Sequence, residues 1–106
     1  MSTTQRLCRV DELAPGTARR FDVGPHRICL VRIGDDFYAI GDRCSHADFS
    51  LSDGEVWADE REIECWKHGS TFSLESGEPQ TLPASVAVPV YEVRVEGADV
   101  LVEVPQ

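Results

Sequence analysis

Two short stretches of the sequence each combine one cysteine with one histidine. The first reads Cys44-Ser45-His46, and the second, after eighteen intervening residues, reads Cys65-Trp66-Lys67-His68. Thiolates and imidazoles are ligands that suit zinc or iron–sulfur chemistry. Because the members of each pair are close in sequence, one tight loop can aim both at one region, and Gly69 tolerates a backbone that a side chain would penalise. Each loop is therefore predicted to act as a two-ligand clamp, and two clamps can close on one metal site.

Three interpretations of these four side chains remain open on the pattern alone. Two cysteines and two histidines make a valid tetrahedral set for structural zinc. Zinc fingers, however, usually supply both cysteines from one half and both histidines from the other, whereas each loop here supplies one of each. That division favours two different iron ions, one held by two thiolates and the other by two imidazoles. The third interpretation is that both pairs are buried side chains without a metal.

The length and charge of the chain limit the classes of protein to which it can belong. A chain of 106 residues is predicted to form one domain, and it is long enough to fold without a stabilising crosslink. Nineteen acidic and ten basic residues give a net charge of −9, which argues against binding to nucleic acids or anionic membranes. The first residues contain no apolar run that could serve as a signal peptide or membrane anchor, so we expect a cytoplasmic protein.

Three further side chains with reactive groups lie outside the two loops. Cys8 and Cys29 fall in strand-like segments and are expected to be thiols in the core, because nothing in the sequence indicates secretion. His26 follows Gly24-Pro25, so we expect it to lie in a turn and to face solvent. These three side chains are left out of the predicted metal site.

The rest of the sequence reads as short strands separated by turns. Residues 28–31 form an apolar run between two arginines, which predicts a central strand buried on both faces. Apolar and charged residues alternate in 91–95, and Val100, Val102 and Val104 form the inward set of a last strand. Other expected strands lie at 6–10, 18–23, 37–40, 54–56, 62–64 and 71–74. We predict an all-β domain in which a loop-rich segment, about 41–81, interrupts strand-forming parts at about 1–40 and 82–106.

The chain resembles the Rieske proteins in two stretches, CSHADFSLSDG at 44–54 and CWKHGSTF at 65–72. Within that family it is most similar to the soluble ferredoxins of bacterial aromatic-ring dioxygenases, the biphenyl dioxygenase type in particular. The resemblance extends from about residue 37 to the C-terminus, and the first 36 residues match only in size and strand pattern. It implies a β-sandwich base built from both ends of the chain, with a small cluster-binding subdomain inserted between them.

The resemblance also implies a cofactor and its ligands. One [2Fe-2S] cluster would be bound, with Cys44 and Cys65 on one iron and with His46 and His68 on the other. High-potential members of the family carry an extra cysteine in each loop, and these cysteines form a disulfide. The loops of this chain have no such cysteine, so no such disulfide is expected.

The same resemblance implies roles for residues near the ligands. Ser70 matches a serine that donates a hydrogen bond to a bridging sulfide, although a hydroxyl that faces solvent is an equal alternative. Phe72 replaces a tyrosine that bonds a ligand sulfur, so we expect a reduction potential at the low end of the family range of about −150 to +300 mV. Trp66 is a candidate docking residue. Pro83 lies in a segment that resembles the loop covering the cluster, although ordinary turn chemistry also explains the proline.

The function that the resemblance implies is electron transfer without catalysis. The protein would take single electrons from a flavoprotein NAD(P)H reductase and pass them to the terminal oxygenase of an aromatic-ring dioxygenase system. Apart from the ligands, the sequence offers no nucleophile–base pair and no glycine-rich phosphate loop, and we expect a monomer that is not itself an enzyme. Two alternatives remain: a redox subunit of another multi-component enzyme such as nitrite reductase, and a zinc-stabilised interaction module.

Acidic residues crowd the loop-rich segment. Seven of them lie within seventeen positions: Asp48, Asp53, Glu55, Asp59, Glu60, Glu62 and Glu64. A solvated acidic surface is the ordinary explanation, and a patch that steers basic partners is the sharper hypothesis.

Overall fold

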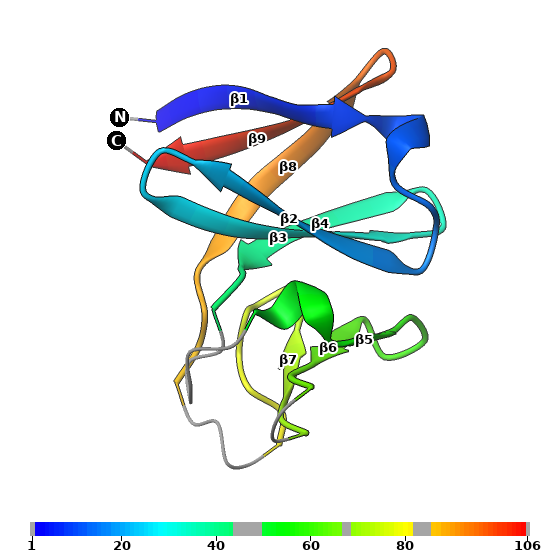
Figure 1. Cartoon of the computed structure of the whole chain (residues 1–106), viewed down its shortest axis with the longest axis vertical. Coiled ribbons are helices and arrows are strands. Elements are labelled where there is room, and N and C mark those ends of the chain that lie inside the picture. Colours follow the sequence, from blue (N-terminus) through cyan, green and yellow to red (C-terminus); the bar gives the residue numbers. More distant parts are fainter. Residues whose placement is uncertain (1, 44–49, 67–68, 82–85, 106) are drawn as a thin grey trace.

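The computed structural model describes residues 2–43, 50–66, 69–81 and 86–105, which form nine strands and two 3-10 helices (Figure 1). The strands are β1 (Ser2–Arg9), β2 (Thr17–Val23), β3 (His26–Ile33), β4 (Asp36–Gly41), β5 (Glu55–Trp57), β6 (Glu62–Glu64), β7 (Thr71–Ser73), β8 (Val90–Glu96) and β9 (Asp99–Pro105). The helices are η1 (Val10–Glu12) and η2 (Leu51–Asp53). Strands dominate, so the all-β class that the sequence predicts is confirmed.

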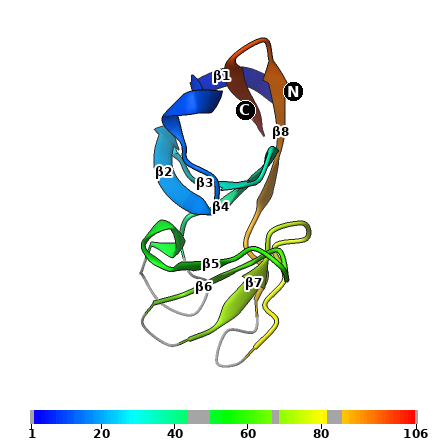
Figure 2. The same cartoon turned by 90° about the vertical axis from the view of Figure 1, so that its right-hand side faces the viewer.

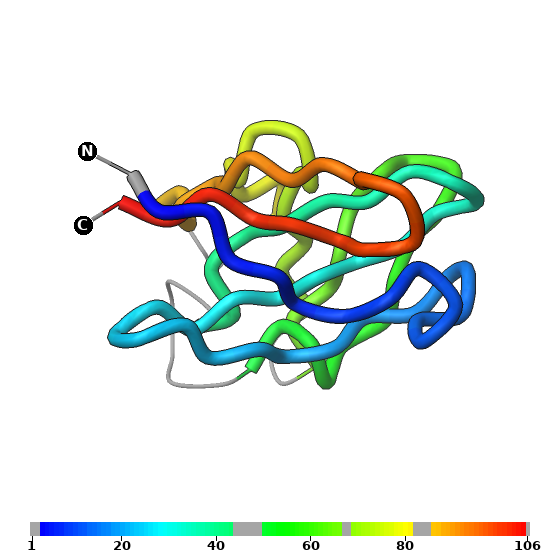
Figure 3. Tube along the Cα trace, turned by 90° about the horizontal axis from the view of Figure 1, so that it is seen from above, coloured from blue at the N-terminus to red at the C-terminus, as the bar shows by residue number. Residues whose placement is uncertain are grey.

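Six strands from the two ends of the chain form one sheet, the base sheet, in the order β1-β9-β8-β4-β3-β2. Its strands pair antiparallel, and the sheet curls into a ring-like layer (Figure 2). Ser2 pairs with Pro105, so both ends of the chain lie side by side (Figure 3). The curled sheet encloses a first core of Cys8, Leu13, Ile28, Leu30, Ala39, Tyr91, Val100, Val102 and Val104.

β3 is the central strand that joins the two halves of the molecule. Ile28 and Leu30 point into the first core, whereas Cys29 and Val31 point into a second core on the other side of the strand. All four side chains are fully buried. The prediction of a strand buried on both faces is therefore confirmed, because an apolar run without alternation leaves neither face for water.

Three short strands form a second sheet, the small sheet, in the order β5-β6-β7. The register aligns Val56 with Ile63 and Ile63 with Phe72, and these three side chains belong to the second core or pack against it. This core lies between the small sheet and β3, and it also contains Leu51 from η2. The small sheet is thus held against the base sheet by apolar contacts.

The structure shifts the ends of some predicted strands. β1 begins at Ser2 rather than at residue 6, because its pairing with β9 continues to Pro105. Val10 falls in η1, where the Glu12 carboxylate accepts a hydrogen bond from the Arg9 N–H at 2.8 Å and ends the strand. Within the described residues, no helix has the length and apolar character needed to cross a membrane. Residues 82–85 lie outside the described parts, so the predicted division at 41 and 82 stays a prediction.

Candidate metal centre

The structure describes three of the predicted site residues, Cys65, Trp66 and Ser70. The other four lie outside the described residues: Cys44, His46, His68 and Pro83. In the parts that are described, no three His, Cys, Asp or Glu side chains form a group that could hold a metal ion. The ligand set therefore stays a prediction. The residues that flank each loop are described, however, and we call them the frame of that loop.

The second ligand loop begins where β6 ends. Cys65 follows β6 directly and is fully buried in the second core. Its N–H donates to the carbonyl of Ser70 at 2.7 Å, and the N–H of Gly69 donates to the carbonyl of Cys65 at 2.9 Å. Gly69 has a φ of +75°, in the region that favours glycine, as the sequence predicts for this position. These contacts close a tight turn whose first residue is a predicted ligand.

The first ligand loop has an equally well-defined frame. Arg43 and Ser50 form an isolated antiparallel bridge, which brackets the segment that contains Cys44 and His46. Just beyond this bridge, the N–H of Leu51 donates to the carbonyl of Asp42 at 2.5 Å. The two arms of the loop are therefore joined at its base.

The small sheet brings the two loop frames together. Glu55 pairs with Glu64, so the strand that follows the first loop lies beside the strand that leads into Cys65. Gly54 lies so close to the carbonyl oxygen of Glu64 that a β-carbon would clash with it. Leu51 and Cys65 share the second core. A glycine at 54 is therefore required for the loop frames to meet.

Asp42 is a buried anchor that no sequence pattern singled out. Its N–H donates to the carbonyl of Arg27 at 2.9 Å, and its Oδ1 accepts a hydrogen bond from the N–H of Ser52 at 2.9 Å. Its Oδ2 lies 4.0 Å from Nε of Arg20 and has no hydrogen bond. The one feature of the sequence that could have indicated its burial is its position, since this acid directly follows the apolar end of β4.

The neighbours of Cys65 divide into buried and exposed side chains. Ser70 is fully buried, so the alternative in which its hydroxyl faces solvent is wrong. Phe72 is also fully buried and lies in the second core. Trp66 is 51% exposed, which leaves it accessible to a partner. Trp57 is also accessible, at 41% exposed.

Cys8 and Cys29 are buried free thiols of the two cores, as predicted. Burial raises the pKa of the Cys8 thiol. Burial also raises the pKa of Cys29 well above its ordinary value, and the carboxylates of Asp42 and Asp53 add to this shift. Both thiols are therefore held in the neutral form, which is a poor nucleophile and a poor metal ligand.

The structure contradicts the expectation that His26 faces solvent from a turn. His26 is the first residue of β3 and is partly buried. Its Nε2 donates to the carbonyl of Pro105 at 3.0 Å, and its Nδ1 lies 3.3 Å from the hydroxyl of Tyr91. The two rings meet edge to face, with centroids 5.7 Å apart. The curl of the base sheet brings these distant residues together, so His26 serves packing and not the metal site.

Comparisons with known proteins agree over nearly the whole chain. The Rieske [2Fe-2S] domain family matches residues 3–92. The ferredoxin component of biphenyl 2,3-dioxygenase from Rhodococcus jostii is 39% identical over 98 residues, which cover 92% of this chain and 90% of that protein. The solved ferredoxin of carbazole 1,9a-dioxygenase from Nocardioides aromaticivorans IC177 is 40% identical, with a TM-score of 0.92, and the match covers 94% of this chain and 96% of that one.

Two further solved structures are similar to this chain. In a complex of reduced oxygenase and oxidised ferredoxin in carbazole 1,9a-dioxygenase, the matching chain is 38% identical, with a TM-score of 0.86 and coverage of 93% and 91%. A putative NADH-dependent nitrite reductase small subunit from Mycobacterium tuberculosis has a TM-score of 0.89 but is 23% identical, with coverage of 100% and 98%. At that identity, the second likeness concerns the fold alone.

Proposed function

This chain belongs to the Rieske [2Fe-2S] domain family, and on that premise we propose that it is a ferredoxin of an aromatic-ring dioxygenase system. Its cofactor is one Rieske-type [2Fe-2S] cluster. The observation that carries the proposal is the 39% identity, over 92% of this chain, with a biphenyl dioxygenase ferredoxin component. When bound, the cluster supplies one-electron redox chemistry at this site.

Four side chains are proposed to hold the cluster: Cys44, His46, Cys65 and His68. The donor set fits the group, because two cysteines on one iron and two histidines on the other are the ligands of a Rieske centre. The position of Cys65 supports this assignment. Its buried thiol lies at the end of β6, where Gly54 brings the frame of the first loop alongside.

The surrounding residues are suited to holding ligands in a fixed arrangement. The backbone hydrogen bonds of Cys65 with Ser70 and Gly69 fix the second loop, and the contacts of Asp42 fix the base of the first. A fixed frame favours electron transfer, since few atoms need to move when the charge changes. Phe72 brings no hydroxyl to the site, which supports a reduction potential at the low end of the family range.

The proposed partners are two proteins. The electron would come from a flavoprotein reductase that oxidises NAD(P)H, and it would pass to a terminal oxygenase. The complex of a similar ferredoxin with its oxygenase supports the second step. We further propose that the chain works as a monomer and converts no substrate itself. Trp66, exposed beside Cys65, is the proposed contact at the end of the molecule that carries the cluster.

Two alternatives are less well supported. A small subunit of nitrite reductase shares the fold, but the likeness at 23% identity does not extend to function. A zinc-stabilised interaction module would need the same four ligands without sulfide. The similarity to dioxygenase ferredoxins, 39–40% identity over more than nine-tenths of the chain, favours the electron carrier over both alternatives.

The test begins with protein purified without air. A Rieske ferredoxin is expected to be red-brown and to contain two iron and two acid-labile sulfide ions per chain. It should then transfer electrons from a dioxygenase reductase to a terminal oxygenase, and transfer to a nitrite reductase instead would favour the first alternative. A colourless protein that contains zinc would contradict the proposal.

A further inference from the structure

We propose that the outward face of β5 and β6 is a docking surface for a basic patch on a redox-partner protein, an inference that rests on the function proposed above. Four side chains make up this surface, which we call the acidic face: Glu55, Trp57, Glu62 and Glu64. The acidic face does not include Trp66, the docking residue proposed above.

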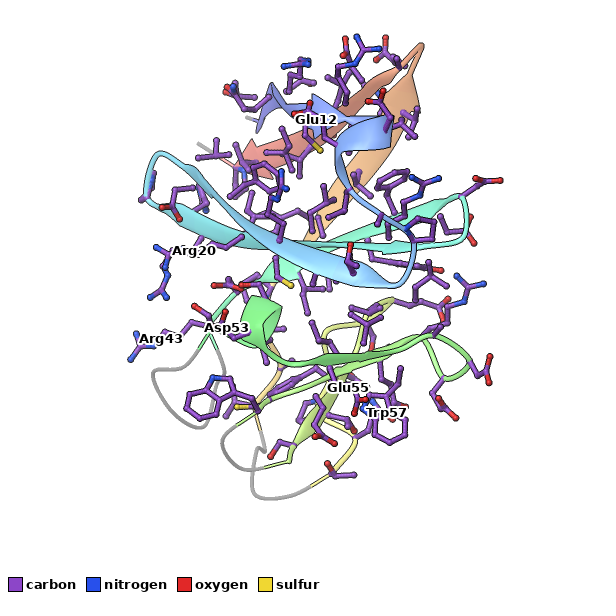
Figure 4. All side chains as sticks on the ribbon, turned by 45° about the vertical axis from the view of Figure 1, so that its right-hand side comes forward. Glu12, Arg20, Arg43, Asp53, Glu55 and Trp57 are labelled. Atoms are coloured by element: carbon purple, nitrogen blue, oxygen red, sulfur yellow. The ribbon has the colours of Figure 1, made fainter. Side chains whose placement is uncertain are left out.

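The strand register places these four side chains on one face. Glu55 pairs with Glu64, and Trp57 pairs with Glu62. Side chains alternate along a strand, and the intervening Val56 and Ile63 face the second core. Figure 4 shows Glu55 and Trp57 on the side of β5 that points away from the base sheet. The small sheet therefore has one apolar face that is covered by the second core and one acidic face, on which Glu55 and Trp57 are exposed and Glu62 and Glu64 are partly exposed.

The charges of the acidic face are not balanced within the described part of the chain. No described basic side chain forms an ion pair with its three glutamates. Arg61, next to β6, instead reaches the base sheet, where its Nη1 lies 3.0 Å from Oδ2 of Asp36 and 3.0 Å from the hydroxyl of Tyr38. Like charges that lie directly opposite in a sheet destabilise it, so the pair of Glu55 and Glu64 favours a cationic partner.

Acids on the base sheet, in contrast, form ion pairs with arginines. Asp99 pairs with Arg6 at 2.9 Å, Asp22 pairs with Arg20 at 3.0 Å, and Glu96 pairs with Arg94 at 2.7 Å. Among the acids on the described strands of the base sheet, only Glu92 lacks an ion pair, whereas all three glutamates of the acidic face lack one.

Trp57 gives this surface an apolar contact as well as a charge. Its side chain is 41% exposed, which is unusual for the largest apolar residue. An exposed indole beside carboxylates suits an arginine or lysine, because the cation can lie over the ring while a carboxylate accepts its N–H groups. Tryptophan and arginine are also enriched in protein interfaces. A second copy of this chain is a poor occupant, since it would bring the same acidic face and a charge of −9.

The position of the acidic face suits electron transfer. Glu64 is followed directly by Cys65, so a protein resting on this surface would lie beside the turn predicted to hold the cluster. The charges of the acidic face also guide the approach of a basic partner.

The test uses cytochrome c, a basic one-electron acceptor, as the probe. The variant Glu55→Gln/Glu64→Gln removes two charges from the acidic face. The control Glu92→Gln/Asp35→Asn removes two exposed charges elsewhere, one on β8 and one in the turn between β3 and β4, where Asp35 pairs with Arg32. Two quantities are measured on the holoprotein: the dissociation constant at low ionic strength by calorimetry, and the second-order rate of cytochrome c reduction as salt is raised.

The acidic-face variant should bind about fivefold more weakly than the wild type, reduce cytochrome c about fivefold more slowly at low salt, and show a flatter salt dependence. The control should change either quantity less than about twofold. Trp57→Ala should weaken binding about threefold and leave the salt dependence unchanged. The visible spectrum of every variant should match the wild type.

Equal behaviour of the acidic-face variant and its control would overturn the docking surface while leaving the electron carrier intact. A dimer that sediments as such in the wild type and is lost in the Trp57→Ala variant would also overturn it, because the face would then serve self-association. A wild-type protein that lacks a cluster would instead contradict the proposed function. The dissociation constants measured by calorimetry would still test whether the acidic face binds a basic protein.

Discussion

The base sheet and the loop-rich segment at 41–81 share a core but differ in how their charges are arranged. The segment contains ten acidic and three basic residues, a formal charge of −7, whereas the rest of the chain contains nine acidic and seven basic residues, a charge of −2. Arginines of the base sheet pair with its acids, as in the contacts of Arg6 and Arg94. One region therefore pairs most of its charges, and the other carries most of the net negative charge.

The two regions also differ in how their backbone is held. The base sheet is a continuous antiparallel ladder in which β3 is buried on both faces. The ligand loops depend on a few particular residues: Asp42 at the base of the first loop, Gly54 where the loops meet, and Gly69 in the second. Substitutions should therefore act locally and strongly in the segment and weakly in matched positions of the base.

The largest difference is expected between two buried thiols. Cys65→Ser should abolish the iron and sulfide content, because it removes one of the proposed ligands. Cys8→Ser, a matched change in the first core, should keep the cluster, since Cys8 lies in β1, away from both loops. Metal and sulfide analysis with visible absorbance measures the outcome. A Cys65→Ser protein with an unchanged spectrum would remove Cys65 from the ligand set.

Gly54→Ala should give the next largest effect, a loss of about 3 kcal/mol in the free energy of unfolding, because the new methyl group would clash with the carbonyl of Glu64. The control is Gly34→Ala in the turn between β3 and β4. Gly34 has a φ of +59° and open space around it, so that substitution should cost only about 1 kcal/mol of backbone strain. Urea unfolding followed by circular dichroism compares the two, and equal losses would show that the loops do not depend on the close approach.

Asp42→Ala should lower the free energy of unfolding by about 2 kcal/mol, since the partly buried N–H of Ser52 loses its acceptor. Asp22 provides the control, because it also pairs with Arg20 but is exposed. Asp22→Ala should cost less than about 1 kcal/mol. If both variants lose the same stability, Asp42 acts only as a charge and not as the anchor of the first loop.

The sequence predicts the base sheet better than the frame of the metal centre. Alternation along 100–104 and the apolar run at 28–31 are local patterns, and the structure confirms both. The contacts of His26 with Tyr91 and Pro105 span 65 and 79 positions, so no local pattern could indicate them. The burial of Asp42 and Ser70 likewise depends on how the small sheet packs against β3. Spacing identified the candidate ligands, but only the fold shows what holds their loops.

The smallest effect concerns pH. Burial raises the pKa of Cys29 well above its ordinary value of 9.0, so the folded protein keeps this thiol neutral while the unfolded chain ionises. Its contribution to stability is complete below pH 9 and is lost as the pH rises from there toward the raised pKa. Thermal unfolding of the wild type should therefore shift to lower temperature above pH 9. Cys29→Ala should show a weaker shift, and an unchanged pH dependence would contradict a role for this thiol.

The central claim is that one thiolate and one imidazole from each loop hold a two-iron cluster that carries single electrons. Electron–nuclear double resonance on the reduced protein tests it most directly, because it detects nitrogen atoms bound to iron. We predict coupling to two histidine nitrogens, in a protein that takes up one electron per chain, and loss of one coupling in His46→Cys. A reduced cluster without nitrogen coupling, or a protein that takes up no electron, would contradict the claim.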